Sequence, residues 1–257
     1  MGAGKQLKVA LQISGTTLSY LTYQVIANPS VSRRFIRVIA NTIADFQDTP
    51  DGELPVIKLH ELCPGIESLE LPLTVSFPEG YELPTNEYVC LAGLIGYLKP
   101  GKVFEIGTYK GRTTRLIAEL TPERCQIYTL DLPPRLMVSG AYFSEERPEL
   151  IGEEFRNHPL RTKIIQLHGD SRSFDFRPFY GQMNFIFVDG DHSYEVVKRD
   201  TAQALRMVKS GGVIVWDDYF PGSTPGVVRC VNELAGTKPI HRISGTRFAY
   251  YRAKEMA

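Results

Sequence analysis

Two carboxylates and an imidazole follow a continuous apolar run in the segment FIFVDGDH, residues 185–192. Asp189, Asp191 and His192 lie within four positions of one another, where a buried strand would end. Carboxylate oxygens bind hard cations such as Mg²⁺, and an imidazole with an ordinary pKa near ~6.5 can accept a proton. The segment therefore predicts a metal site or an acid–base site. The alternative is a turn in which Asp191 and His192 only cap the next helix.

Polar residues also end the other apolar runs of the same kind. They are Glu105, Gly107, Thr108 and Gly111 in EIGTYKG, Asp131 after the second run, Asp170 and Ser171 after the third, and Asp217 and Asp218 after the fifth. Glycines let the backbone approach a ligand closely, and an acid that follows such a loop by some twenty residues typically accepts bonds from ribose hydroxyls. A turn explains any one of these ends equally well, but acids at five successive ends favour a binding edge.

Strand and helix patterns alternate from Thr85 onward. Strands are predicted at 102–107, 126–132, 163–169, 184–190 and 212–219, and helices at 85–98, 111–120, within 143–157, and at 194–208 and 225–235. Strands that are apolar throughout and separated by helices indicate a parallel sheet covered on both faces. Two further runs meet at Ser244-Gly245-Thr246 with no room for a helix, so they predict an antiparallel hairpin.

Composition restricts the partners. The 257 residues carry 29 basic and 29 acidic side chains, so the formal net charge is zero and no electrostatic footprint for nucleic acid exists. The four cysteines are widely spaced, which predicts reduced, mostly buried thiols. The first residues make a poor signal peptide and no membrane span. We therefore expect a cytoplasmic protein.

Residues 1–84 are predicted to be an N-terminal extension to a domain at 85–257. Within the extension, Phe35, Ile39, Ile43 and Phe46 form an apolar stripe on a predicted helix. The stripe indicates either that the extension encloses a substrate or that it contacts a second copy in a homo-oligomer. The long connection 133–162 suggests a lid or a segment that selects substrates.

Four other residues leave two interpretations open. Trp216 and Tyr219 flank the acids after the fifth strand, as the walls of a substrate pocket or as core residues. Arg199 and Asp200 either pair with other residues or lie on a solvated helix face.

Residues 86–253 resemble the class I S-adenosylmethionine-dependent methyltransferases. The motifs VFEIGTYKGRTT, FVDGDHSYEVVKRD and GGVIVWDDY carry the resemblance, in the family's order and spacing. The signature DGDHSYE is typical of a small-molecule O-methyltransferase-like group that includes macrocin and mycinamicin O-methyltransferases and cephalosporin hydroxylase-type proteins. The resemblance implies a Rossmann-like α/β fold, with a mostly parallel seven-stranded sheet that ends in an antiparallel hairpin.

The resemblance also implies roles for the residues at the strand ends. Glu105 and Gly107, with Thr108 and Gly111 in the same loop, would lie beside the methionine part of S-adenosylmethionine, Asp131 would hold the ribose hydroxyls, and Asp170 and Ser171 would lie by the adenine. Asp189 would contact the cofactor or, with Asp217 and Asp218, bind Mg²⁺. His192 would be the catalytic base, with Asp189 beside it. This sequence has Asp-Asp where catechol enzymes have Asp-Asn.

The predicted function is methyl transfer from S-adenosylmethionine to a hydroxyl of a small molecule, such as a sugar, a phenol or a natural product, with or without Mg²⁺. The alternative is a relative of the cephalosporin hydroxylase type that binds the cofactor without methylating. Neither nucleic acid nor a membrane is expected as a partner.

Overall fold

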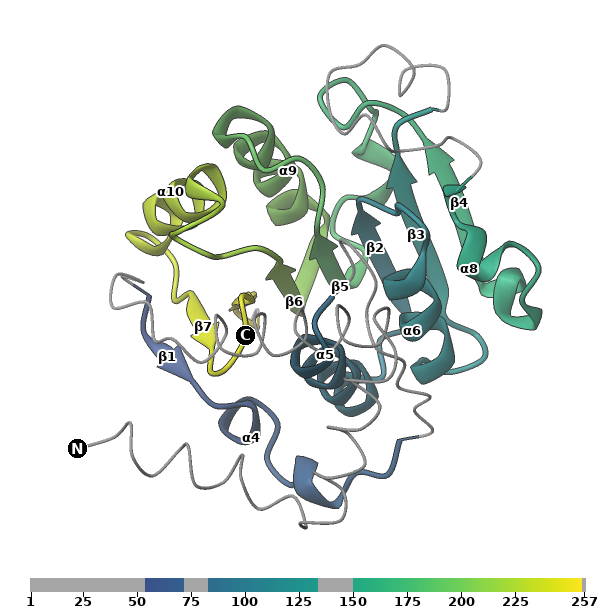
Figure 1. The fold of residues 1–257 in the computed structure, drawn as a ribbon, viewed down its shortest axis with the longest axis horizontal. Helices are drawn as coiled ribbons and strands as arrows, with labels where there is room; N and C mark the ends of the chain where they lie inside the picture. Colours follow the sequence, from purple (N-terminus) through teal and green to yellow (C-terminus); the bar gives the residue numbers. More distant parts are fainter. Residues whose placement is uncertain (1–53, 72–82, 134–149, 256–257) are drawn as a thin grey trace, which may run out of the picture. The chain divides into compact units, whose positions relative to one another are not determined.

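The computed structural model describes residues 54–71, 83–133 and 150–255, and all of them belong to one compact unit, residues 48–257. Figure 1 shows its strands side by side in one sheet, with helices in front of and behind them. In chain order the elements are β1 (Val56–Ile57), α4 (Leu59–Leu62), α5 (Thr85–Leu98), β2 (Lys102–Ile106), α6 (Arg112–Leu120), β3 (Gln126–Asp131), α8 (Glu153–Arg156), β4 (Ile164–His168), β5 (Met183–Val188), α9 (Tyr194–Met207), β6 (Val208–Trp216), α10 (Pro225–Ala235), β7 (His241–Ile243) and β8 (Ala249–Arg252). Short 3₁₀ turns lie at Ile66–Ser68, Pro159–Lys163 and Arg177–Phe179.

The sheet has the order β1-β7-β8-β6-β5-β2-β3-β4. Strands β2 to β6 pair in parallel, and β8 inserts between β6 and β7 and runs antiparallel to both. The predicted α/β fold, with a mostly parallel sheet and a final hairpin, is confirmed. Beyond the seven predicted strands, the two residues of β1 pair in parallel with β7 at the sheet's edge. Residues 56 and 57 of the predicted extension thus join this sheet, while the boundary at residue 85 stays a prediction.

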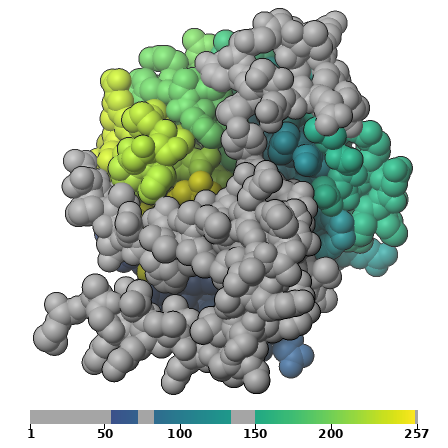
Figure 2. Space-filling view, in the orientation of Figure 1, coloured from purple at the N-terminus to yellow at the C-terminus, as the bar shows by residue number. Residues whose placement is uncertain are grey.

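Alternation along the strands creates a separate hydrophobic core on each face of the sheet. On one face Val103, Phe185 and Val215 pack with α5 and α6. On the other face Phe104 and Ile186 pack with α9 and α10. Figure 2 shows part of this second layer, the green and yellow-green helices α9 and α10, at the surface of the molecule. Because both faces are covered, the sheet's edges and strand ends are left to form a site.

The pairing register brings the strand ends to a common edge. Ile106 of β2 pairs with Leu130 of β3 and with Val188 of β5, and Val188 pairs in turn with Trp216 of β6. Parallel strands all end on the same side, so the loops that follow β2, β3, β5 and β6 emerge together. The acids predicted to gather at one edge of the sheet therefore start from adjacent positions.

Two boundaries differ from the predicted ones. The segment KSGG does not cap α9, because β6 already begins at Val208 and an irregularity separates the pairs Met183–Val208 and Phe185–Val213. The strand predicted to reach residue 219 ends at Trp216, which leaves Asp217 and Asp218 in the loop. Within 143–157 the described residues contain only the four-residue helix α8. The predicted helix at 31–46 and residues 134–149 of the connection 133–162 lie outside the described residues.

Several buried side chains resolve open interpretations. All four cysteines are free and buried, as predicted. Trp216 and Tyr219 are core residues, with 0% and 1% of their surface exposed. Asp200 is also buried, whereas Arg199 is exposed. Across the described ranges no helix has both the length and the apolar character needed to cross a membrane.

We predict that Gly226→Ala destabilises the protein. Gly226 lies in the first turn of α10, where a Cβ atom would meet the carbonyl oxygen of His192 at 2.4 Å and the backbone nitrogen of Tyr194 at 2.5 Å. Because both atoms belong to the backbone, the loop must shift, and we expect the free energy of unfolding to fall by about 1–3 kcal/mol.

Chemical denaturation measures this change. The matched control is Gly236→Ala at the other end of α10, where the nearest atom to a new Cβ lies at 3.4 Å. Equal stabilities of the two variants would contradict the packing described for the His192 loop.

Candidate active site

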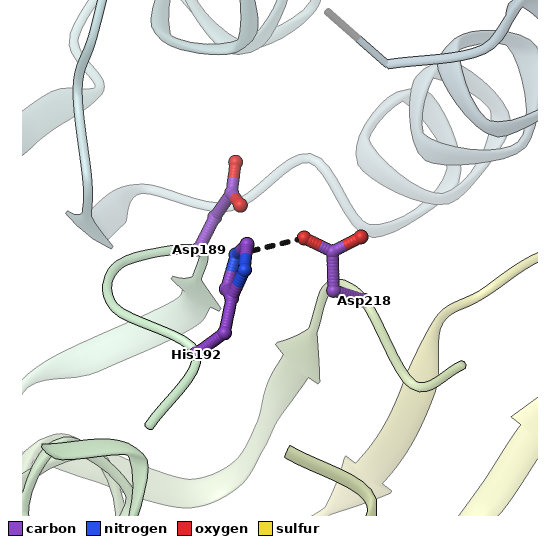
Figure 3. A group of neighbouring side chains, drawn as sticks. All are labelled: Asp189, His192 and Asp218. Atoms are coloured by element: carbon purple, nitrogen blue, oxygen red, sulfur yellow. Dashed lines mark ion pairs between the residues drawn. The ribbon is translucent and has the colours of Figure 1, made fainter. Parts of the chain in front are cut away.

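Asp189, His192 and Asp218 converge at the carboxyl edge of the sheet. Asp189 directly follows β5, His192 lies in the loop before α9, and Asp218 lies in the loop after β6. One ligand atom from each residue lies within 4.8 Å of the others. Figure 3 shows the three side chains beside one another, with the ion pair between the Nε2 atom of His192 and the Oδ2 atom of Asp218 at 2.9 Å.

Hydrogen bonds within the two loops fix the orientation of these side chains. Asp218 has a left-handed backbone, with φ of 57°, which aspartate tolerates better than most residues. Its carbonyl oxygen accepts bonds from the backbone N–H of Phe220 at 2.7 Å and from the Thr224 hydroxyl. In the other loop, the Oδ1 atom of Asp191 accepts the backbone N–H of Ser193 at 2.6 Å. Asp191 thus forms the turn, and the imidazole of His192 faces Asp218 instead of capping α9.

The His192–Asp218 ion pair shifts the pKa values of both residues. The hydrogen bond that His192 donates to Asp218 raises the pKa of His192 above its usual value, although burial opposes this. Burial opposes ionisation of Asp218, but the His192 hydrogen bond and the Arg247 charge outweigh it, and the pKa of Asp218 is lowered. Burial, followed by the charge of Asp218, raises the pKa of Asp189 well above its usual value. The edge therefore holds one firmly ionised carboxylate beside an imidazole of enhanced basicity.

Arg247 and Glu87 also belong to this site, and the sequence analysis missed both. The Nη1 atom of Arg247 lies 2.9 Å from the Oδ1 atom of Asp218, and its Nη2 atom lies 2.7 Å from the Oε2 atom of Glu87. Glu87 is in the first turn of α5 and is completely buried. A buried acid in a helix that is otherwise apolar needs a cationic partner, and this was the signal in the sequence.

Asp217 does not join the converging group. Its side chain is 6% exposed, and its Oδ1 atom accepts the backbone N–H of Asp218 at 2.6 Å. Burial, and then the charges of Asp218 and Asp189, raises the pKa of Asp217 well above its usual value. Of the three predicted magnesium ligands, the structure brings together Asp189 and Asp218, with His192 in the third position.

This arrangement does not fit a Mg²⁺ site. Magnesium prefers octahedral oxygen ligands, whereas one of the three converging side chains is an imidazole. Both oxygens of Asp218 already contact cationic groups, His192 and Arg247. A divalent ion bound to Asp218 would also lie close to the guanidinium, with strong mutual repulsion.

The loop after β2 is fastened to its neighbours through the backbone. Gly107 has φ of 98°, and a Cβ atom there would lie 1.9 Å from the carbonyl oxygen of Asp189. Asp131 accepts the N–H groups of Thr108 and Tyr109 on Oδ2, at 3.0 and 2.7 Å, and the N–H of Leu132 on Oδ1, at 2.7 Å. Asp131 therefore holds the predicted cofactor loop in place from the neighbouring strand.

Glu105 is completely buried and does not face the edge. Its Oε2 atom accepts bonds from the hydroxyls of Thr114 and of Thr129, the latter at 2.5 Å, and its Oε1 atom has no partner. Burial raises the pKa of Glu105 to about 7. The Thr108 hydroxyl joins the same cluster, 2.6 Å from that of Thr129. Glu105 and Thr108 thus belong to one buried hydrogen-bonded cluster with Thr114 and Thr129.

The described end of the long connection packs against the same loop. The backbone N–H groups of Gly152 and Glu154 donate to the carbonyls of Tyr109 and Lys110, at 2.8 and 2.9 Å. A Cβ atom at Gly111, where φ is 82°, would lie 2.4 Å from the Phe155 ring. Residues 150–155 therefore support the loop from the outside.

The residues after β4 make two different contacts. Asp170 forms an ion pair with Arg172, and the side-chain hydrogen bond lowers the pKa of Asp170. Ser171 lies near Asp200, a residue of α9 with 1% exposure. Burial raises the pKa of Asp200 to about 7, and its Oδ1 atom lacks a partner. Asp200 is thus a buried acid and not part of a solvated helix face.

Comparisons with known proteins agree with this geometry. Residues 104–219 match a family described as "Methyltransferase domain". Among curated proteins, none is similar enough to count as a match. The matched range begins in β2 and ends just after Asp218, so it contains the strand ends described above. This part of the chain is therefore similar to a methyltransferase domain.

Solved structures share the fold at low identity. An O-methyltransferase from Bacillus cereus in complex with SAH is 17% identical, with 76% of this chain and 90% of that chain covered and a TM-score of 0.51. Cofactor-bound Rv0187 from MTB is 18% identical, with 89% and 99% covered and a TM-score of 0.52. SAH-bound methyltransferase PaMTH1 from Podospora anserina is 15% identical, with 68% and 80% covered and a TM-score of 0.50. The likeness concerns the fold, the Rossmann-like fold of methyltransferases.

We predict that Asp218→Asn lowers the pKa of His192. The substitution removes the anion that raises this pKa and leaves burial and the Arg247 charge, which both lower it. NMR titration of the imidazole should therefore show a midpoint at lower pH than in the unaltered protein. Asp191→Asn is the control, because it removes a nearby charge without a hydrogen bond to the imidazole, so its effect should be smaller. An unchanged midpoint in Asp218→Asn would refute the pairing.

Proposed function

We propose that this protein transfers a methyl group from S-adenosylmethionine to the hydroxyl of a small molecule. One observation carries the proposal: the His192–Asp218 pair lies at the sheet edge where the loop of Gly107 touches Asp189. A base oriented by a carboxylate, next to a glycine loop that opens a helix, suits proton removal beside a bound cofactor.

The residues at the edge fit the parts of the cofactor. Asp131 and Asp170 are only partly buried, and their carboxylates can accept bonds from ribose hydroxyls and from an adenine amino group. The first turn of α6 follows Gly111, and its N–H groups have no partner within the helix. S-adenosylmethionine supplies an activated methyl group on a sulfonium, which leaves as a neutral thioether. We assign Gly107, Thr108 and Gly111 to the shape of the loop, and Ser171 to the adenine side.

The chain's own contribution is alignment and proton removal. The acceptor oxygen attacks the methyl carbon in line with the carbon–sulfur bond, so its position matters more than any help to the leaving group. In the neutral imidazole, Asp218 holds the Nε2–H, and Nδ1 keeps the lone pair that takes the hydroxyl proton. As the proton arrives, the Asp218 carboxylate stabilises the imidazolium. Asp189 borders the same space, and burial raises its pKa.

The magnesium-assisted form of this reaction remains a prediction from the sequence, and the poor fit of the donor set argues against it. Assays with and without excess chelator separate the two forms. Complete loss of methyl transfer in chelator, with recovery on adding Mg²⁺, would favour the metal.

A screen with a labelled methyl group tests the proposal itself. Protein, S-adenosylmethionine carrying an isotopic methyl, and a panel of sugars, phenols and natural-product alcohols are incubated and analysed by mass spectrometry. A labelled methyl ether on one class of acceptor is the expected result. Cofactor binding without transfer to any acceptor would favour the non-methylating alternative.

We predict that Asp131→Asn weakens the binding of S-adenosylhomocysteine. Asparagine cannot accept on both of its terminal atoms, so the loop amides or the Leu132 N–H lose their acceptor. We expect a loss of about 1–3 kcal/mol in binding free energy, measured by isothermal titration calorimetry. Asp175→Asn serves as control, because that exposed acid pairs only with Arg177 on the surface. Unchanged affinity in Asp131→Asn would remove Asp131 from the cofactor site.

We predict that His192→Ala lowers kcat about 10²–10⁴-fold, the usual contribution of a positioned general base. The affinity for S-adenosylhomocysteine should change little, because the imidazole contacts Asp218 and not the loop of Gly107. Steady-state kinetics with the acceptor from the screen, combined with calorimetry, gives both quantities. A fully active variant would show that alignment alone drives the reaction.

A further inference from the structure

Arg247 is held rigidly in the turn between β7 and β8. Its Nε and Nη2 atoms contact the two carboxylate oxygens of Glu87 at 3.0 and 2.7 Å, and its own backbone N–H donates to the Oε1 atom of Glu87 at 2.6 Å. Its carbonyl oxygen accepts the N–H of Tyr219 at 2.8 Å. The guanidinium therefore cannot leave the edge without breaking a bidentate ion pair.

The burial of Glu87 requires a cation beside its carboxylate. The side chain of Glu87 is 0% exposed and that of Arg247 is 26% exposed, so the carboxylate depends on this partner for its charge balance. The first turn of α5 is docked on the same hairpin by a second bond, from the Asn86 side chain to the carbonyl of Gly245 at 2.6 Å. Helix and hairpin together fix the guanidinium before any ligand binds.

The third guanidinium nitrogen of Arg247, Nη1, contacts the His192–Asp218 pair. Its Nη1 atom lies 2.9 Å from the Oδ1 atom of Asp218, whose Oδ2 atom binds His192. Three acids, Asp189, Asp217 and Asp218, emerge at this edge, and without a nearby cation their charges would repel. Arg247 is the cation that the chain itself provides at the position where a metal would have to bind Asp218.

We propose that Arg247 takes the place of a divalent cation in this enzyme, so that methyl transfer needs no metal. The inference rests on the proposed function for the reaction, but its central claim concerns cation binding. Arg247 is a positioning residue: it holds Asp218, which orients His192, and the hydroxyl proton passes to His192 while the oxygen–carbon bond forms and the carbon–sulfur bond breaks. Removal of the guanidinium should therefore free one oxygen of Asp218. A metal ion should then bind there and replace the missing positive charge.

The experiment measures Mn²⁺ binding to the purified protein by electron paramagnetic resonance, which requires neither cofactor nor acceptor. A single Arg247 substitution would leave Glu87 as a buried unpaired charge, so the main variant is Glu87→Gln combined with Arg247→Gln, which neutralises both partners. The matched control is Asp175→Asn combined with Arg177→Gln, which neutralises an exposed pair on the surface. Circular dichroism and thermal unfolding verify that each variant is folded.

We expect the unaltered protein and the control to bind no Mn²⁺ at millimolar concentration, and the Glu87→Gln/Arg247→Gln variant to bind one ion. With the acceptor from the screen, the unaltered enzyme should be indifferent to chelator. The variant should lose about 10–100-fold in kcat in chelator, with little change in KM, and should recover on adding Mn²⁺. Arg247→Lys, which keeps a positive charge, should retain more activity in chelator than the double variant.

Three results would overturn the proposal. The first is stoichiometric Mn²⁺ binding by the unaltered protein. The second is full activity of the double variant in chelator, and the third is a folded double variant that is inactive and binds no ion. The binding measurement keeps the inference separate from the proposed reaction: a protein that methylates nothing can still gain a cation site when Arg247 is replaced.

Discussion

The backbone of Gly107 lies against the backbone of Asp189, and the rest of the site depends on this contact. It extends the β2–β5 pairing beyond its last pair, Ile106 and Val188, and the Asp189 N–H donates to the Ile106 carbonyl at 2.8 Å. No side chain fits between the two loops. The loop that precedes α6 and the loop that carries His192 are therefore held at a fixed distance from each other.

The charged side chains at this edge alternate in sign. His192, Asp218, Arg247 and Glu87 form a continuous row of ion pairs from the solvent-exposed imidazole to a completely buried carboxylate. Each inner member contacts two groups of opposite sign, which offsets the cost of removing it from water. Because the row is coupled, the loss of one member affects the charge state of the others. The basicity of His192 thus depends on residues from α5, from the loop after β6 and from the hairpin.

The fold could be predicted from the sequence because periodicity reports burial directly. Apolar runs separated by amphipathic helices led to the parallel sheet, and the short turn at Gly245 led to the hairpin. The polar residues at the strand ends also predicted a binding edge, so Asp189, His192 and Asp218 could be named as candidates from the sequence. Periodicity does not report which buried side chain pairs with which, so the bonds of Glu105 to Thr114 and Thr129 could not be predicted, and its place beside the cofactor stays a prediction. Asp217 and Asp218 are adjacent in sequence, yet the left-handed turn at Asp218 separates their roles.

Arg247 and Glu87 escaped the sequence analysis because each looks ordinary in its own segment, a turn arginine and an acid in the first turn of a helix. They are 160 residues apart in the chain. That separation affects how the protein folds. Strand β8 enters the sheet between β6 and β7, which both precede it in the chain, so a strand that follows its neighbours in the sequence fills an interior position. Non-local pairings of this kind form late and slowly. Until the hairpin has inserted, Asp218 and Glu87 lack their guanidinium, so assembly of the β-sheet itself completes the row of ion pairs.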